Sequence, residues 1–367
     1  MNELSSIERA RYTRHFSLSE IGPQGQQKIK ESKVLCVGAG GLGSTVLYYL
    51  AAAGVGTLGI VDPDCVDLSN LQRQILYSTE DIGKPKAELA KKRLLALNPH
   101  LQINSYPVSL TEENVFSLFA EYNLIVDATD NYAARYLIND ACCTLKKPDV
   151  FAGILRFQGQ CSVFGVADGP CYRCLYPEPP PPNLIPNCNE AGVLGVLPGI
   201  LGCMQATEVL KWIVGTGELL VGRILSFDAL KARWTEYKLN RHPHCPLCVH
   251  SLPFSDLKRP REACDLVRVP EMTVAEFKHL QTQERDFILL DVREVGEYAQ
   301  QHMHGYLIPL GQLDARFHEL DKEKLIIVHC KSGMRSQKAG ALLIDKGFKR
   351  VTSLQGGIMA WDAAQHE

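Results

Sequence analysis

A glycine-rich turn near the start of the chain constrains its fold more than any other feature of the sequence. The turn follows the apolar run KVLCVG and precedes an apolar segment at residues 42–53. Its glycines are Gly38, Gly40, Gly41 and Gly43. Between a strand and a helix, such a turn lets the backbone approach a phosphate, which the free amides of the helix attract. The pattern predicts a βαβ unit that binds a nucleotide at its first turn.

Apolar and amphipathic segments continue to alternate after this turn. TLGIVD and LIVDATD are typical of buried strands, whereas residues 86–98 and 132–145 have apolar side chains at helical spacing. We therefore expect an α/β fold with a doubly wound, mostly parallel sheet, whose ligands bind at the carboxyl ends of the strands. A smaller α/β unit follows, with strands at FILLDVR and KLIIVHC and a helix at 336–346.

The length of 367 residues favours two domains rather than one. Residues 251–269 are polar and lack periodicity, which predicts a linker between domains at 1–250 and 270–367. A net charge of −2 gives no general attraction to nucleic acid or membrane, and we expect neither as a partner. The polar start and the lack of a long apolar span predict a cytoplasmic protein, where thirteen cysteines indicate metal binding or thiol chemistry.

Polar residues after the second strand favour a triphosphate as the nucleotide. Asp62 ends that strand, where a carboxylate can hold ribose hydroxyls, an arrangement that is also typical of NAD and FAD proteins. The residues beyond it suit phosphoryl chemistry because they can neutralise charge that develops on phosphorus. They are Asn70, Arg73, Gln74 and Lys86, each of which could instead be a solvated surface residue.

Asp130 follows the strand LIVDATD at the same edge of the predicted sheet. A Mg²⁺ ion that bridges phosphate oxygens usually takes one or two carboxylates from the protein, and Asp130 could supply one of them. The alternative is that Asp130 caps the N-terminus of the helix that follows.

Two CxxC pairs, Cys171 with Cys174 and Cys245 with Cys248, predict a metal site. Four thiolates satisfy a tetrahedral Zn²⁺ ion, and such a closed site stabilises the fold rather than taking part in catalysis. The alternative, that these cysteines are small buried apolar residues, suits one pair better than two.

Cys188 follows a proline-rich segment at residues 177–186, which cannot sustain a helix or a central strand. We expect an exposed loop there, from which a thiol could reach an electrophile. The alternative is an unreactive loop cysteine, because exposure alone does not activate a thiol.

The loop from Cys330 to Arg335 predicts a reactive sulfur site. It lies between the strand KLIIVHC and a helix, so backbone amides surround the sulfur while Lys331 and Arg335 add positive charge. These groups favour a thiolate and would stabilise a persulfide anion. Phosphatases also place Cys and Arg in such a loop, but theirs is one residue longer, which favours sulfur here.

The order GAGGLG, IVDPDCVDLSNLQRQ, GKPKAE and DATDN resembles the ubiquitin-activating-enzyme-like adenylyltransferases, in the branch that contains the molybdopterin-synthase and thiamine-biosynthesis enzymes. The resemblance covers roughly the first 250 residues. It implies ATP bound with Mg²⁺, Asp62 on the ribose, Asp130 near the metal, and Asn70, Arg73, Gln74 and Lys86 around the phosphates.

The same resemblance implies a homodimer in which Arg14 reaches the nucleotide of the partner subunit. The family's substrate is the C-terminal Gly-Gly carboxylate of a small ubiquitin-like sulfur carrier, which is activated as an acyl adenylate. The family shares the two CxxC pairs. At the position of Cys188, the family's cysteine attacks the adenylate in some members and is dispensable in others.

Residues from about 270 to 367 resemble a rhodanese, through LLDVRE, LQGGIMAW and Cys330, which aligns with the cysteine that carries the persulfide. The segment QHMHGYLIPL departs from the family pattern because it lacks a proline, and we expect altered packing near Asp291 and Arg293.

Together the two resemblances predict a fused adenylyltransferase and sulfurtransferase. It would adenylate the carrier and then form its thiocarboxylate with sulfur from a Cys330 persulfide, which a donor such as a cysteine desulfurase would supply. The alternatives are a dinucleotide-dependent oxidoreductase and a carrier-binding scaffold without catalysis. Molybdopterin, thiamine, cysteine and tRNA thiolation pathways all remain open.

Overall fold

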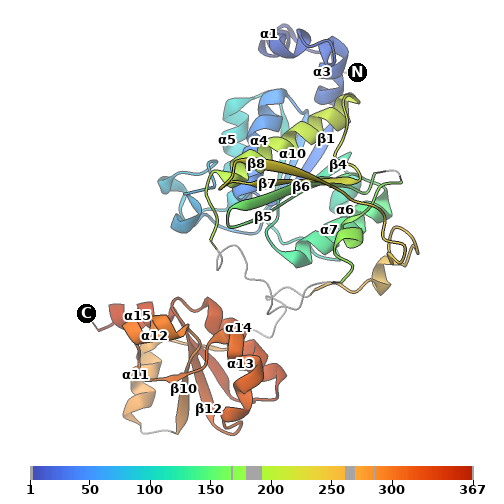
Figure 1. The fold of residues 1–367 in the computed structure, drawn as a ribbon. Helices are drawn as coiled ribbons and strands as arrows, with labels where there is room; N and C mark the ends of the chain where they lie inside the picture. Colours follow the sequence, from blue (N-terminus) through green and yellow to red (C-terminus); the bar gives the residue numbers. More distant parts are fainter. Residues whose placement is uncertain (1–2, 167, 179–191, 261–268, 284–285, 366–367) are drawn as a thin grey trace. The chain divides into compact units, whose positions relative to one another are not determined.

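The structure is a computed structural model, which describes residues 3–166, 168–178, 192–260, 269–283 and 286–365 (Figure 1). The chain divides into two compact units, Met1–Pro260 and Arg261–Glu367. Each unit has helices on both faces of a sheet, so the predicted α/β fold is confirmed. Within the described ranges, no helix combines the length and the hydropathy needed to cross a bilayer.

The first unit contains an eight-stranded sheet in the order β3-β2-β1-β4-β5-β6-β7-β8. Strands β3 to β5 in this order are parallel, whereas β5 to β8 are antiparallel. The strands are β1 (Lys33–Val37), β2 (Thr57–Val61), β3 (Gln102–Tyr106), β4 (Leu124–Asp127), β5 (Asp149–Leu155), β6 (Gln158–Phe164), β7 (Arg223–Asp228) and β8 (Arg233–Lys238). Because β2 and β4 flank β1 on opposite sides, the topological switch point lies at the carboxyl ends of β1 and β4.

Helices cover both faces of this sheet. The α-helices are α1 (Ser6–Arg11), α2 (Thr13–Phe16), α3 (Gly22–Glu31), α4 (Gly41–Ala53), α5 (Lys86–Leu97), α6 (Val115–Ala120), α7 (Tyr132–Leu145), α8 (Tyr172–Leu175) and α10 (Leu197–Val214). The 3-10 helices are η1 (Leu68–Asn70), η2 (Thr79–Asp81) and η3 (Phe254–Asp256). Val34 and Cys36 of β1 share one apolar cluster with α4 and α10, and Leu35 and Val37 share another with α6 and α7. The central strand is therefore buried on both faces, as a parallel strand should be.

The second unit contains a five-stranded parallel sheet in the order β11-β10-β12-β13-β9. Its strands are β9 (Glu271–Met272), β10 (Phe287–Asp291), β11 (Tyr306–Leu307), β12 (Leu325–His329) and β13 (Val351–Leu354). Its helices are α11 (Val274–Thr282), α12 (Val295–Gln300), α13 (Leu310–Arg316), η4 (Phe317–Glu319), α14 (Met334–Asp345) and α15 (Gly357–Ala363). Helix α14 begins two residues before the predicted 336, because Gly333 at φ 101° turns the chain into it.

The glycine turn is packed too closely for larger residues. A Cβ atom at Gly43 would lie 2.0 Å from the carbonyl oxygen of Gly38, and one at Gly38 would lie 2.6 Å from that of Ala128. Gly38 also has φ 96°, which side-chain-bearing residues rarely adopt. The glycines thus join the end of β1, the start of α4 and the end of β4 in one tight contact.

We expect Gly43→Ala to destabilise the first unit by about 1–3 kcal/mol, because backbone must move to admit the methyl group. The free energy of unfolding from urea denaturation measures this loss. Gly199→Ala is the matched control on helix α10, since its Cβ atom would meet nothing closer than 3.9 Å. Equal unfolding free energies for the two variants would contradict the prediction.

Candidate functional site

Asp62 is fixed beneath the glycine turn. It follows β2 and is buried, and its Oδ2 accepts a hydrogen bond from the Ala39 amide at 2.7 Å. Its Oδ1 accepts a second from the Asp64 amide at 2.9 Å. Because Gly40, the N-cap of α4, has no side chain, the first amides of that helix receive no cap from it and remain suited to an anion.

The ammonium group of Lys86 compensates the negative charges of Asp62 and Asp64. It is the first residue of α5, it is buried, and its Nζ lies 2.9 Å from Oδ2 of Asp64. Burial raises the pKa of Asp62, while the Lys86 ammonium and the two amides oppose that rise. The Tyr77 hydroxyl lies 2.9 Å from the Ala39 carbonyl oxygen and 3.3 Å from that of Lys86, so it joins the turn to α5.

The structure brings Arg73 and Gln74 to the glycine turn. A Cβ atom on Gly41 would lie 3.4 Å from Cγ of Arg73, and one on Gly40 would lie 3.6 Å from Nε2 of Gln74. Arg73 donates to the Ser69 carbonyl at 3.1 Å. Among the described residues, the buried Oε1 of Gln74 has no hydrogen-bond partner, which leaves it available to a ligand.

Asn70 has a local structural role in the same segment. Its Oδ1 accepts a hydrogen bond from the Asp67 amide at 3.2 Å, and this contact closes the capping box of η1. Its backbone carbonyl accepts the amides of Arg73 and Gln74. Asn70 therefore shapes the segment that carries the two neighbouring side chains.

Asp130 is exposed in the loop between β4 and α7. Asn131 is the N-cap of α7, since its Oδ1 accepts the Ala134 amide at 2.8 Å. The alternative that Asp130 caps this helix is therefore wrong. The carboxylate of Asp130 stays exposed beside the switch point, at the strand edge that also carries the glycine turn.

Two buried residues that the sequence analysis missed hold the loop of Asp130. Oδ1 of Asp127 accepts hydrogen bonds from the Thr129 amide at 2.9 Å and from the Thr129 hydroxyl at 2.6 Å. Arg135 donates to the Thr129 carbonyl at 3.0 Å. Burial raises the pKa of Asp127, and the positive charge of Arg135 opposes that rise. The sequence did carry a signal for these two residues. Asp127 is an acidic residue in an apolar strand, and Arg135 is an arginine in an apolar helix.

One predicted site residue, Arg14, has no described contact with this turn. Arg14 is exposed on α2. Cys188 lies outside the residues that the structure describes.

The four cysteines of the CxxC pairs converge. Their Sγ atoms all lie within 4.8 Å of one another, with 3.5 Å between Cys171 and Cys245 and 3.3 Å between Cys174 and Cys248. Tetrahedral zinc thiolate sites have Zn–S distances near 2.3 Å, which place sulfur atoms about 3.8 Å apart. The cluster therefore fits a metal ion of this kind. Cys143 of α7 packs beside it as a half-buried fifth thiol.

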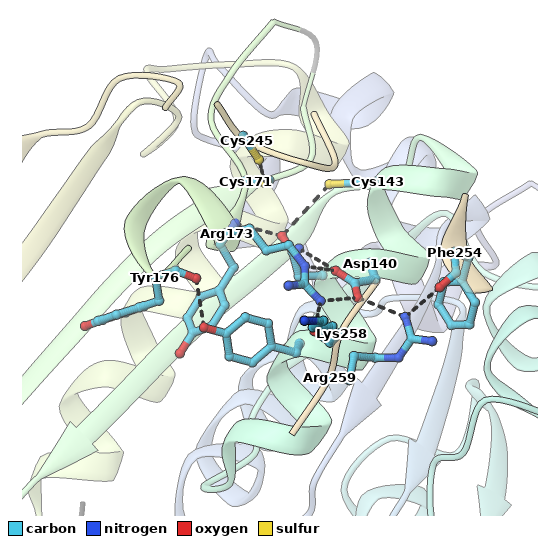
Figure 2. Close-up of polar contacts among 12 residues, drawn as sticks. Asp140, Cys143, Cys171, Arg173, Tyr176, Cys245, Phe254, Lys258 and Arg259 are labelled. Carbon is cyan, nitrogen blue, oxygen red and sulfur yellow. Dashed lines mark hydrogen bonds and ion pairs between the residues drawn. The ribbon is translucent and has the colours of Figure 1, made fainter. Parts of the chain in front are cut away.

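A buried carboxylate ties the cysteine cluster to its surroundings (Figure 2). Asp140 of α7 accepts two hydrogen bonds from Arg173, at 2.7 and 2.8 Å, and one from Arg259 at 3.1 Å. Arg173 stands between Cys171 and Cys174, and it also donates to the Lys258 carbonyl at 2.9 Å. We call this arrangement the Asp140 clamp. Through it, Lys258 and Arg259, which lie in the segment predicted as a linker, are held within the first unit.

Cys330 lies in a loop that directs an amide at its sulfur. The side chain is buried directly after β12, and Sγ accepts a hydrogen bond from the Gly333 amide at 3.2 Å. The Ser336 hydroxyl lies 3.8 Å from Sγ. The Ile358 amide donates to the Cys330 carbonyl at 2.8 Å, so the segment LQGGIMAW is hydrogen-bonded to the loop.

The guanidinium of Arg335 is paired with Glu297 of α12. Both of its Nη atoms lie 2.7 Å from the two carboxylate oxygens, in a bidentate arrangement. Its positive charge is therefore compensated, and Lys331, which is exposed, remains as the second cation of the loop. The sequence analysis missed Glu297, which lies 38 positions before Arg335.

We expected altered packing near Asp291 and Arg293, and the structure describes contacts of both side chains. The two side chains form a buried pair with 2.6 Å between Nη2 and Oδ2, and Arg293 also donates to the Gln301 carbonyl at 2.8 Å. Gln301 belongs to the divergent segment itself. Burial lowers the pKa of the neighbouring His329, which keeps its ring neutral.

We expect Lys86→Met to reduce stability by about 2 kcal/mol at pH 8, because it leaves the buried Asp62 carboxylate uncompensated. A raised pKa means that the folded state binds the proton more tightly, so stability falls as pH rises through that pKa. The loss should therefore be smaller at pH 5, as measured by urea denaturation at both pH values. Asp62→Asn in the same chain should reduce the loss at pH 8, and a loss that is independent of pH would contradict the explanation.

Comparisons with known proteins find a family match in each of the two units. Residues 12–247 match the ThiF family and residues 273–364 match the Rhodanese-like domain. The chain is 40% identical over 368 residues to a "Probable adenylyltransferase/sulfurtransferase MoeZ" of Mycobacterium tuberculosis, covering 98% of this chain and 94% of the relative. It is 51% identical over 243 residues to a "Sulfur carrier protein adenylyltransferase" of Thermus thermophilus, covering 65% of this chain and 90% of the relative.

A third relative also extends through both units. This "Adenylyltransferase and sulfurtransferase MOCS3" of Culex quinquefasciatus is 36% identical over 393 residues, covering 98% of this chain and 89% of the relative. The fold of this chain is similar to the crystal structure of E. coli MccB, with a TM-score of 0.59 and 22% identity over 66% of this chain and 73% of that one. Both resemblances in the sequence are thereby confirmed. The chain belongs to the ThiF family and continues into a rhodanese-like domain.

Proposed function

We propose that the protein adenylates the C-terminal glycine of a ubiquitin-like sulfur carrier with ATP and then converts it to a thiocarboxylate with sulfur from Cys330. The observation that carries the proposal is that one chain holds both a charge-compensated glycine turn and a cysteine loop with an amide directed at its sulfur. The names of the relatives, which describe sulfur carrier adenylation and sulfur transfer, support the same conclusion.

In this proposal the first unit binds ATP with Mg²⁺. Asp62 would hold the ribose and Asp130 the metal, while Asn70, Arg73, Gln74 and Lys86 would surround the phosphates. The unpartnered Oε1 of Gln74 and the uncapped start of α4 support this assignment. A carboxylate is a poor electrophile, and its mixed anhydride with AMP supplies a leaving group. The chemistry then needs positioning and charge neutralisation more than covalent participation by the protein.

The second step uses a persulfide on Cys330. Its outer sulfur would form a bond to the carbonyl carbon as the bond to AMP breaks, which gives an acyl disulfide on Cys330. A second thiolate would then attack the inner sulfur and form a disulfide with Cys330, while the S–S bond to the acyl group breaks and the thiocarboxylate leaves with the electron pair. The Gly333 amide supports a negative charge at this position. Cys188 stays our candidate for a further thiol that reacts with the activated carrier.

The partners and the location follow from the same proposal. A persulfide donor such as a cysteine desulfurase would load Cys330, and a homodimer would bring Arg14 to the partner's nucleotide. We also propose a cytoplasmic location, because the thiol chemistry of Cys330 and the proposed metal site both need reduced cysteines. Molybdenum cofactor and thiamine biosynthesis are pathways that need this product.

We propose that the cysteine cluster holds a structural Zn²⁺ ion, and we expect about one zinc ion per chain by mass spectrometry of the purified protein. Cys174→Ser should lose most of this zinc and should lower the midpoint of thermal unfolding, because the metal joins two distant parts of the first unit. Cys65→Ser, which changes an exposed cysteine, is the control and should keep its zinc. Equal zinc contents in the two variants would refute the site.

Cys330→Ala should retain carrier-dependent exchange of pyrophosphate into ATP, because adenylation does not need this thiol. It should lose thiocarboxylate formation, measured as the mass of the carrier after incubation with ATP and a loaded cysteine desulfurase. Cys203→Ser is the matched control and should retain both activities. Full thiocarboxylate formation by Cys330→Ala, without another sulfur source, would remove the second unit from the mechanism.

A further inference from the structure

We infer that Glu297 determines the donor specificity of the Cys330 loop and favours a protein persulfide over small dianionic donors such as thiosulfate. The inference rests on the proposed persulfide chemistry of Cys330 and deepens it by naming the class of donor. Its basis is the carboxylate that occupies the guanidinium of Arg335.

Glu297 is held firmly in its position. Its two oxygens accept hydrogen bonds from both Nη atoms of Arg335 at 2.7 Å. Its Oε2 also accepts the Glu294 amide at 3.0 Å, which closes the capping box at the start of α12. The side chains of Glu297 and Arg335 are 33% and 24% exposed, so the pair is partly withdrawn from solvent and only partly screened.

The carboxylate is charged throughout the range in which enzymes are assayed. The hydrogen bonds from Arg335 lower the pKa of Glu297 to about 2, against the opposing effect of partial burial. Titration therefore does not release Arg335 near neutral pH. Only a substitution or a competing ligand can do so.

An occupied guanidinium is poorly suited to a dianion. Sulfonate and phosphate groups are held best by a bidentate arginine, and that arrangement is already taken by Glu297. A thiosulfate ion at the loop would have to replace two charge-assisted hydrogen bonds while it approached a fixed negative charge. The same argument disfavours the phosphatase alternative, which needs the arginine free for phosphate.

A protein persulfide is repelled less strongly by the Glu297 carboxylate than thiosulfate is. It carries one negative charge rather than two, and its binding energy comes from a protein surface rather than from the loop alone. Lys331 remains exposed at the loop and can attract either donor. The net effect of Glu297 is thus to discriminate between donors by charge and size.

Both transfers balance without an additional oxidant or reductant. With thiosulfate, the Cys330 thiolate attacks the outer sulfur, the S–S bond breaks, and sulfite leaves with the electron pair. With a protein persulfide, the thiolate attacks the terminal sulfur and the donor thiolate leaves. Each reaction yields the same Cys330 persulfide, and cyanide can then remove its outer sulfur as thiocyanate.

The test compares Glu297→Gln with the wild-type full chain in thiosulfate:cyanide sulfurtransfer. We expect kcat/KM for thiosulfate to rise by about tenfold, mainly through a lower KM, because the guanidinium of Arg335 becomes free to bind the dianion. Persulfide loading from a cysteine desulfurase supplied with cysteine should change less than threefold. Glu294→Gln is the matched control, because its exposed carboxylate acts on Arg335 through space and forms none of the described hydrogen bonds of that guanidinium. This variant should leave kcat/KM for thiosulfate within twofold.

Further variants separate specificity from stability. In an Arg335→Gln background, Glu297→Gln should no longer raise the thiosulfate activity, because there is no guanidinium to release. If Glu297→Gln does not fold, Glu297→Asp shortens the carboxylate, breaks the bidentate pair and should still lower KM for thiosulfate.

Three results would overturn the inference: no gain with thiosulfate in a folded variant, an equal gain with both donors, or the same gain in the Arg335→Gln background. A wild-type chain that transfers sulfur from neither donor, like Cys330→Ala, would instead refute the proposed function itself.

Discussion

The close contact between the glycine turn and the end of β4 is the constraint on which the first unit depends. A side chain at Gly38 would collide with the Ala128 carbonyl, and one at Gly43 would collide with the Gly38 carbonyl. These contacts bring together the two strand ends that flank the switch point, where a ligand of an open α/β sheet binds. Asp62 and the loop of Asp130 are positioned by the same contact, since both extend from strand ends that the turn holds in place.

The sequence was sufficient to predict the parallel centre of the first sheet, because its strands are continuous apolar runs separated by amphipathic helices. The antiparallel strands β6 to β8 were not predicted. Strand β8 is exposed along its whole length and lacks the apolar signal of a buried strand. Local patterns also predicted the cysteine cluster and the Cys330 loop, because the residues of each motif can be recognised from their spacing in the sequence.

Electrostatic partners were harder to predict, because they pair residues far apart in the chain. Glu297 and Arg335 are separated by 38 positions, and Asp140 and Arg259 by 119. Nothing in the local sequence marks such a pair, although each compensates a charge that would otherwise be costly in a protected position. Their discovery changes the chemical interpretation of a motif, as Arg335 illustrates: the motif predicts a free cation, and the fold supplies its counter-ion.

The Asp140 clamp has a consequence for the chain as a whole. One carboxylate is shared between an arginine inside the first CxxC pair and an arginine that lies next to the final residue of the first unit. Loss of the metal ion that we propose would free the backbone around Arg173. Asp140 would then lose the position that its hydrogen bonds to Arg173 give it, and it would hold Arg259 less firmly. Metal depletion would thus loosen the last residues of the first unit, where the chain leaves it for the rhodanese-like domain.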